Sequence, residues 1–162
     1  MTQSTPLNNT QDINSQNVIA VWLKPFDDGK SYAGFAYIPL AEAETLRDKV
    51  LPSLAEVIFV HHQDPEEFRQ EIEKLGYPEA AQEIDNRPRD RNTRMGNFGE
   101  IIAAEYLKQV RGYNIPIYRL RYNQNPESSL KGNDLLGFKF GDSHGQGREL
   151  IVGEVKTMSE FD

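Results

Sequence analysis

The chain has 162 residues and a formal net charge of −7, and 38% of its residues are hydrophobic, which suffices for a packed core. It contains no apolar run near the roughly 20 residues that a membrane-spanning helix needs, and its first residues do not form a secretory signal. The absence of cysteine excludes disulfides, thiol catalysis and thiolate zinc sites. A soluble, cytoplasmic protein with one main domain is therefore expected.

Basic residues are concentrated in the middle of this acidic chain. Residues 87–121 carry 8 basic and 3 acidic side chains, whereas residues 1–86 carry 6 and 15, and residues 122–162 carry 4 and 7. Such a block can form a local phosphate-binding surface in a protein of low isoelectric point. An ordinary solvated surface has the same counts, so charge alone leaves both interpretations open.

The first part of the chain predicts a mobile polar tail over residues 1–17, followed by a small α+β region over residues 18–86. Residues 18–23 and 32–39 are aromatic and β-branched, and the polar turn at residues 27–30 between them predicts a hairpin.

Three further elements are expected before the basic block. Residues 41–50 predict a helix, and residues 56–60 predict a short buried strand. Pro65, followed by two glutamates, marks the start of another helix, which should end near Gly76.

The second part predicts a basic linker over residues 87–95, followed by a helix over residues 96–111. Apolar side chains recur in this helix at every fourth position: Phe98, Ile102, Tyr106 and Val110. Three strands should follow, over residues 117–122, 134–140 and 150–157, with a turn-rich loop after the first and a hairpin tip at residues 141–147.

The predicted hairpin would bring charged side chains to one end of a sheet. Glu154 and Lys156 project on the same face of their strand, and counting back from the hairpin tip places Asp134 at the same end as Glu154. Two carboxylates beside a lysine form a hard-oxygen site suited to Mg²⁺ or Mn²⁺. The alternative is an edge strand whose charges are simply solvated.

Glu100 supplies a third acid at the start of the predicted helix. It borders the apolar stripe of that helix and follows Gly96 and Gly99, two small residues that permit close approach to a sheet or ligand. A glutamate in the first turn is also favoured by the helix dipole, which needs no ligand.

The order of Glu100 on a helix, then Asp134, then Glu154 and Lys156 on consecutive strands resembles the PD-(D/E)xK nuclease superfamily. The local sequences are GNFGE at 96–100, KGND at 131–134 and GEVKT at 153–157. They are similar to those of the HamA family, the nuclease-like subunits of the Hachiman antiphage defence system. The resemblance covers residues 94–157, about two fifths of the chain, and extends on weaker grounds to residues 18–86.

The resemblance implies metal-dependent cleavage of DNA phosphodiesters. Asp134, Glu154 and the carbonyl of Val155 would bind Mg²⁺ or Mn²⁺, Lys156 would position the attacking water, and Glu100 would support the metal through a water. It also implies a helicase partner, HamB. The implied fold is α/β, with a restriction-endonuclease-like mixed sheet over residues 96–162.

Two features depart from the superfamily pattern. Asn133 stands where the superfamily name has proline, and only five residues follow Thr157, where the core normally continues with a helix and a strand. A partial core is therefore expected, with an apolar strand covered by a partner or a second copy. Two alternatives stay open: a non-catalytic interaction module with a vestigial site, and a phosphate-binding module that binds DNA without hydrolysis.

Two weaker signals complete the sequence. His61 and His62 precede Asp64, which permits a metal site, although polar residues that close a strand are the simpler interpretation. Three tyrosines lie beside three arginines: Tyr113, Tyr118 and Tyr122 with Arg111, Arg119 and Arg121. They could stack on and neutralise single-stranded DNA, or form an amphipathic strand with snorkelling arginines.

Overall fold

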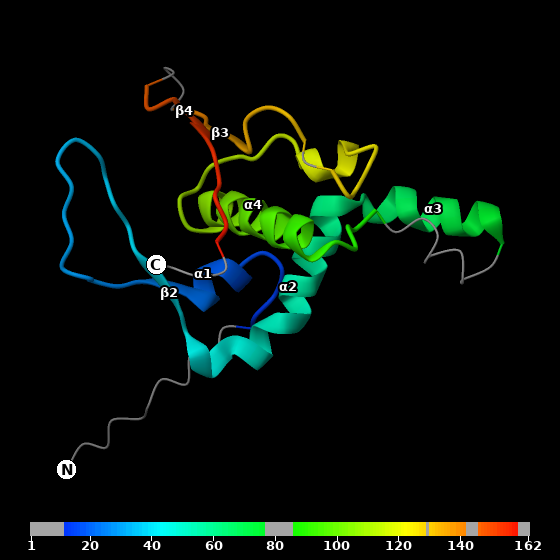
Figure 1. Cartoon of the computed structure of the whole chain (residues 1–162), viewed down its shortest axis with the longest axis horizontal. Helices are drawn as coiled ribbons and strands as arrows, with labels where there is room; N and C mark the ends of the chain where they lie inside the picture. Colours follow the sequence, from blue (N-terminus) through cyan, green and yellow to red (C-terminus); the bar gives the residue numbers. More distant parts are fainter. Residues whose placement is uncertain (1–11, 77–85, 129, 142–145, 159–162) are drawn as a thin grey trace, which may run out of the picture.

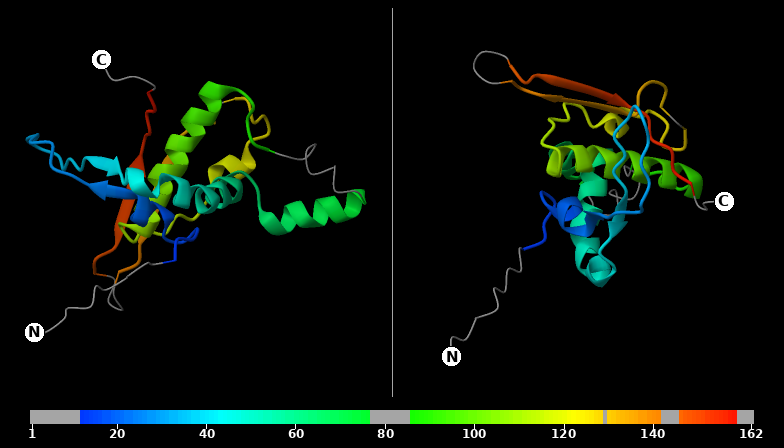
Figure 2. Two further views of the ribbon diagram at one scale, coloured as in Figure 1. Left: turned by 90° about the horizontal axis from the view of Figure 1, so that it is seen from below. Right: turned by 90° about the vertical axis from the view of Figure 1, so that its left-hand side faces the viewer.

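The computed structural model describes residues 12–76, 86–128, 130–141 and 146–158. Within these residues the chain forms four α-helices and two small antiparallel sheets of two strands each. Helix α4 lies between helices α1 and α2 on one side and the β3–β4 hairpin on the other (Figures 1 and 2). No helix in the described residues is long and apolar enough to cross a membrane.

The N-terminal hairpin exists but is displaced from its predicted position. Residues 18–22 form helix α1 (Val18–Trp22) instead of a strand, because Val18 and Ile19 are fully buried side by side against α2 and α4. The paired strands are β1 (Leu23–Pro25) and β2 (Leu40–Glu42), joined by a long loop. Most of the predicted tail, residues 1–11, lies outside the described residues.

The strand predicted at residues 56–60 is wrong. A short 3₁₀-helix, η1 (Glu44–Leu46), leads into helix α2 (Arg47–His62), which includes those residues as well as Pro52. Proline normally interrupts a helix, and a short apolar run fits a buried strand as well as a helix. The sequence therefore predicted a helix that ends at residue 50 and a separate strand where the structure has one helix. Its buried positions nevertheless follow helical spacing: Val50, Leu54, Val57 and His61.

Helix α3 (Pro65–Leu75) confirms the prediction at both ends. The Asp64 side chain accepts hydrogen bonds from the first-turn amides, and Gly76 ends the helix with φ of 78°, a left-handed conformation that favours glycine. Figures 1 and 2 show α3 projecting away from the other helices.

Helix α4 (Arg91–Gln109) begins earlier than predicted, so that part of the expected basic linker is helical. Asp90 caps it by accepting a hydrogen bond from the amide of Thr93. The buried apolar residues of α4 join those of α1, α2 and the following loop in one core: Val18, Ile19, Val50, Leu54, Val57, Ile101 and Leu120.

The predicted three-stranded sheet is wrong at its first strand. Residues 119–122 form a 3₁₀-helix, η3 (Arg119–Tyr122), in which Leu120 joins the core. Arg119 donates a hydrogen bond to the carbonyl of Leu130, and Arg121 donates one to the carbonyl of Val60 in α2. Strands β3 (Leu135–Lys139) and β4 (Glu149–Gly153) pair as predicted, and an additional bridge joins Asn114 to Phe138. The strand predicted at residues 150–157 is wrong in its second half, because β4 ends at Gly153 and Glu154 and Lys156 lie in the segment after it. The hairpin tip at residues 142–145 lies outside the described residues.

The described residues therefore contain a two-stranded hairpin where a restriction-endonuclease-like mixed sheet is expected. Apolar side chains on this hairpin are exposed, as predicted. Leu150 is 71% exposed, and Leu136 and Val152 are also exposed.

Candidate functional site

The register of the hairpin brings Asp134 and Glu154 to the same end of the sheet, as predicted. Leu135 pairs with Gly153 at the end of the ladder, so the two acids are the next residues along each strand. One carboxylate oxygen of Asp134, Oδ2, accepts a hydrogen bond from the backbone amide of Val155 at 2.9 Å. This bond fixes the Asp134 side chain against the start of the segment that follows β4.

Arg119 lies between Asp134 and Glu100. Its Nη1 is 3.0 Å from Asp134 Oδ1, and its Nε is 3.7 Å from Glu100 Oε2. The same guanidinium also donates hydrogen bonds to the carbonyls of Leu130 and Asn133, at 2.8 and 2.6 Å. Because four groups hold it, Arg119 acts as a fixed counter-ion that joins α4 to the hairpin.

Glu100 is the least satisfied carboxylate of this site. It is half-buried, and its Oε2 is buried without a hydrogen-bond partner. Burial raises the pKa of Glu100; the charge of Arg119 opposes this rise and the nearby Asp134 carboxylate adds to it. A buried oxygen with spare accepting capacity is available to a water or a cation.

A small cavity adjoins these side chains. It has a volume of about 20 Å³, and its charged lining residues are Glu100, Arg119 and Asp134, with His61 and Tyr118 beside them. A cavity needs roughly 10–15 Å³ of such volume to hold one water molecule. The space beside the two carboxylates therefore admits one water or one small ion.

Glu154 and Lys156 lie in solvent. Their side chains are 70% and 80% exposed and pair with each other, Nζ to Oε2, at 3.6 Å. Among the residues that the structure describes, no three acidic or histidine side chains are grouped closely enough to hold a metal ion. The structure thus brings Glu100 and Asp134 together around Arg119, with Glu154 and Lys156 at the same end of the hairpin.

Gly99 lets the segment after β4 lie directly on α4. A Cβ atom at this position would overlap the Thr157 hydroxyl and come within 3.2 Å of Val155 Cγ1. Gly96 has open space around it, so only one of the two predicted small residues is needed for close approach.

The carboxylates at this site have the donor chemistry that divalent cations prefer, but in the described residues they are not grouped closely enough to form a complete metal site. Asp134 and Glu100 offer carboxylate oxygens, one of them without a hydrogen bond, and Glu154 lies one residue beyond the last pair of the hairpin. Oxygen ligands of this kind are those that Mg²⁺ and Mn²⁺ prefer. Arg119 already neutralises two of the three carboxylates, so a cation would have to compete with it.

His61 and His62 serve the interior of the molecule. His61 Nε2 lies 2.9 Å from Glu105 Oε1, and both residues are buried. His62 contacts the Ile58 carbonyl through Nδ1 and the Asn97 side chain through Nε2. Both histidines belong to α2 rather than to the end of a strand, so that interpretation of them is wrong.

Arg119 and Glu105 are the residues that sequence reasoning missed in these roles. The sequence places Arg119 on the outer face of a strand and contains no local pattern that distinguishes Glu105 from a solvated helix residue. Tyr118 is likewise packed internally: its ring lies 4.2 Å from that of His61 and 4.9 Å from the guanidinium of Arg121. The contacts of Arg119 with Asp134 and of His61 with Glu105 and Tyr118 join parts of the chain that are distant in sequence, so no local pattern predicts them.

Comparisons with known proteins agree on one family. The HamA family model matches residues 11–162. The Hachiman protein HamA of Bacillus cereus is 38% identical over 96 residues, which are 56% of this chain and 35% of that relative. The matched region thus spans about a third of the relative's length. No solved structure matches significantly.

Proposed function

Because this chain belongs to the HamA family, we propose that it takes part in Hachiman-type antiphage defence and cleaves DNA as a metal-dependent endonuclease of the PD-(D/E)xK kind. The observation that carries this proposal is the pair of carboxylates at one end of the hairpin. Asp134 is oriented by the Val155 amide and lies beside Glu100, whose buried oxygen is unsatisfied. The register supports Glu154 as the third acid.

Each residue has a distinct role in the proposed reaction. Asp134 and Glu154, with the carbonyl of Val155, would hold Mg²⁺ or Mn²⁺, and Glu100 would support it through a water. A bound divalent cation lowers the pKa of a coordinated water and neutralises charge on the phosphate.

Lys156 would orient the attacking water and stabilise the negative charge that develops on the phosphate. Its Nζ lies 3.6 Å from Glu154 Oε2, so the ammonium group is already beside one proposed ligand. Both side chains are exposed, which leaves them accessible to a substrate as large as DNA.

A helicase of the HamB kind is the proposed partner. A helicase would present DNA to a site that lies at the open end of a two-stranded hairpin. The exposed apolar face around Leu150 and Val152 offers a surface that such a partner or a second copy could cover.

A non-catalytic module is the second candidate, and one observation favours it. Arg119 is bonded to Asp134 and lies near Glu100, while Glu154 and Lys156 neutralise each other in solvent. Acidic groups that are already neutralised need no metal, so the same residues are compatible with a structural or DNA-binding role.

Plasmid nicking in Mg²⁺ or Mn²⁺ tests the proposal, with and without a helicase partner. The Glu154→Ala/Lys156→Ala variant should lose cleavage by at least about a hundredfold, the scale typical of general acid–base catalysis. The matched control is Lys139→Ala/Glu149→Ala, which removes the other ion pair of the same hairpin, also 3.6 Å long.

Cleavage that survives in the Glu154→Ala/Lys156→Ala variant would contradict the proposed site. An absence of nicking by the folded wild-type chain under every condition, including with the partner, would favour the non-catalytic module instead. Equal losses in the two double variants would show that the hairpin, rather than the proposed site, supports cleavage.

A further inference from the structure

A second cavity, far larger than the one beside Asp134, lies between α2 and the first half of α4. Its volume is about 750 Å³, within the range of roughly 300–1,000 Å³ typical of small-molecule sites. Among the described residues, four arginines and no acidic side chain line it: Arg87, Arg89, Arg91 and Arg94. In a chain of net charge −7, such a concentration of arginines among the described lining residues favours the binding of an anion.

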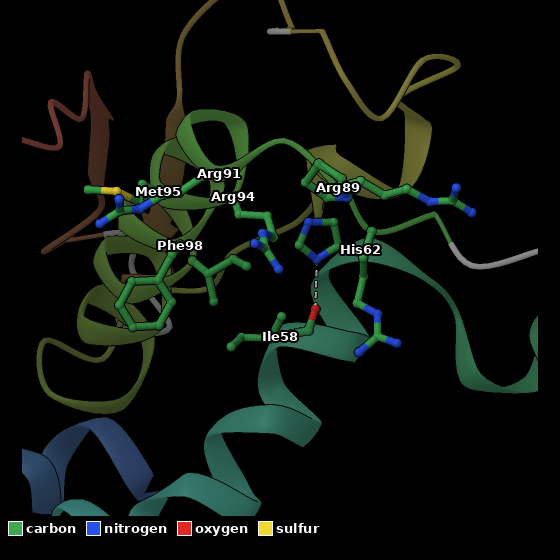
Figure 3. Close-up of a pocket in the computed structure, with 10 residues that line it drawn as sticks. Ile58, His62, Arg89, Arg91, Arg94, Met95 and Phe98 are labelled. Carbon is green, nitrogen blue, oxygen red and sulfur yellow. Dashed lines mark hydrogen bonds between the residues drawn. The ribbon is translucent and has the colours of Figure 1, made fainter. Parts of the chain in front are cut away.

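Arg94 is the arginine best placed to meet a ligand. Figure 3 shows its side chain extending into the cavity between Phe98 and His62, whereas Arg89 points away from them. Within the described residues, neither Arg94 nor Arg91 takes part in an ion pair. Their positive charges are therefore available to an anion.

Apart from His62, the remaining described wall of the cavity is apolar. Phe98, Met95 and Ile58 line it beside the arginines, and the Phe98 ring is partly exposed (Figure 3). Guanidinium groups bind phosphate oxygens through paired hydrogen bonds, and an aromatic ring with a thioether beside it suits the flat face of a nucleobase. One cavity thus combines the two chemistries of a nucleotide.

We propose that this cavity binds a phosphorylated nucleoside, with its phosphates at Arg94 and Arg91 and its base against Phe98 and Met95. The site is separate from the acidic site, because Glu100 contacts groups on the hairpin side of α4 and the cavity opens on the α2 side. The buried Ile101 lines both cavities. A free nucleotide and the phosphorylated end of a DNA strand present the same chemistry.

Isothermal titration of the full chain with ATP, AMP, pyrophosphate and a short 5′-phosphorylated oligothymidylate tests this proposal. The Arg91→Ala/Arg94→Ala variant should bind ATP at least about tenfold more weakly, because charge-assisted hydrogen bonds to the phosphates are lost. Arg111→Ala, which removes an exposed positive charge just beyond the opposite end of α4, should bind as the wild type does.

The outcomes separate the parts of the proposal. ATP should bind more tightly than pyrophosphate, and equal affinities would overturn the assignment of a nucleoside. No binding of any probe, or equal losses in the Arg111→Ala control, would overturn the site altogether. Tighter binding of the oligonucleotide than of ATP would identify a strand end as the ligand, and the reverse would identify a free nucleotide.

A failure here is distinguishable from a failure of the proposed nuclease. The Glu154→Ala/Lys156→Ala variant should keep its affinity for ATP, because those side chains do not line the cavity. Plasmid nicking and nucleotide titration therefore report on different residues. Circular dichroism of each variant checks that the substitutions leave the fold intact.

Discussion

Helix α4 carries two carboxylates in opposite situations. Glu105 is only 1% exposed, and its oxygens accept hydrogen bonds from His61, Gln109 and Lys108. Burial by itself would raise the pKa of Glu105, but the bonds from His61 and Gln109 and the charge of Lys108 outweigh it, so the pKa lies below its ordinary value.

Glu100 is the reverse case on another face of the same helix. It is less buried, yet it has one unsatisfied oxygen and a pKa that burial raises above its ordinary value despite the charge of Arg119. This difference indicates that Glu105 is the structural carboxylate of the two. A saturated acid holds helices together, whereas an unsaturated acid beside Asp134 retains the capacity to bind something else.

Removal of Glu105 should have the largest effect. Glu105→Ala leaves His61 and Lys108 without their buried acceptor, and breaking a buried pair in this way costs roughly 3–5 kcal/mol of unfolding free energy. Urea denaturation followed by circular dichroism measures the loss.

Glu100→Ala is the matched control on the same helix. Its one ion pair is 3.7 Å long, so the loss should stay below about 1 kcal/mol. Equal losses of unfolding free energy in the two variants would show that both carboxylates stabilise the fold to the same extent, which would contradict a structural role for Glu105 alone.

Arg119→Ala should have the next largest effect. The variant loses hydrogen bonds to Asp134 and to two carbonyls, which should cost about 2 kcal/mol, and it leaves Glu100 and Asp134 as neighbouring negative charges. Mn²⁺ should therefore raise the melting temperature of this variant more than that of the wild type. Differential scanning fluorimetry across a Mn²⁺ titration measures both.

Arg121→Ala is the control for Arg119→Ala. Arg121 also donates to a carbonyl, that of Val60, and pairs with a carboxylate, that of Asp64. Its loss should destabilise the fold without increasing the response to Mn²⁺. The same response in both arginine variants would contradict a cation site at Glu100 and Asp134.

The sequence predicted elements whose signals are local. Helix α3 is marked by Pro65 and Gly76 at its ends, and the β3–β4 hairpin follows from a polar tip between two apolar runs. The prediction that Asp134 and Glu154 lie at the same end of the sheet came from that hairpin alone.

The sequence failed where distant contacts decide the structure. Alternation at residues 117–122 resembles a strand, which would place Arg119 and Arg121 on one face. In the structure Arg119 bonds to the loop before β3 and Arg121 bonds to the Val60 carbonyl in α2, so the backbone turns between them. The contact of His61 with Glu105 joins positions 44 residues apart, and no local period records it. The set of site residues predicted from the sequence therefore lacked Arg119, which pairs with both Asp134 and Glu100.

Alanine at the two glycines of α4 should have smaller, contrasting effects. Gly96→Ala meets open space and should gain roughly 0.5–1 kcal/mol from better helix propensity. Gly99→Ala should lose that gain, because its Cβ displaces Thr157 and Val155 and strains the bond from Val155 to Asp134. Urea denaturation of both variants tests this, and equal gains would show that the segment after β4 does not lie on α4.

The smallest expected effect is a pH dependence of opposite sign at the two carboxylates. Because the folded pKa of Glu100 lies above its ordinary value of 4.5, its ionised form costs stability above the folded pKa and costs nothing below 4.5. Glu100→Gln should therefore be slightly more stable than the wild type at pH 7, with a gain that vanishes in acid.

The folded pKa of Glu105 is lowered, so the ionised form of Glu105 contributes stability above pH 4.5, and this contribution is lost as the pH falls through the folded pKa. Glu105→Gln should accordingly be less stable at neutral pH and approach the wild type in acid. Unfolding free energies from pH 3 to pH 8 test both signs, and parallel curves for the two variants would contradict the assignment of different roles.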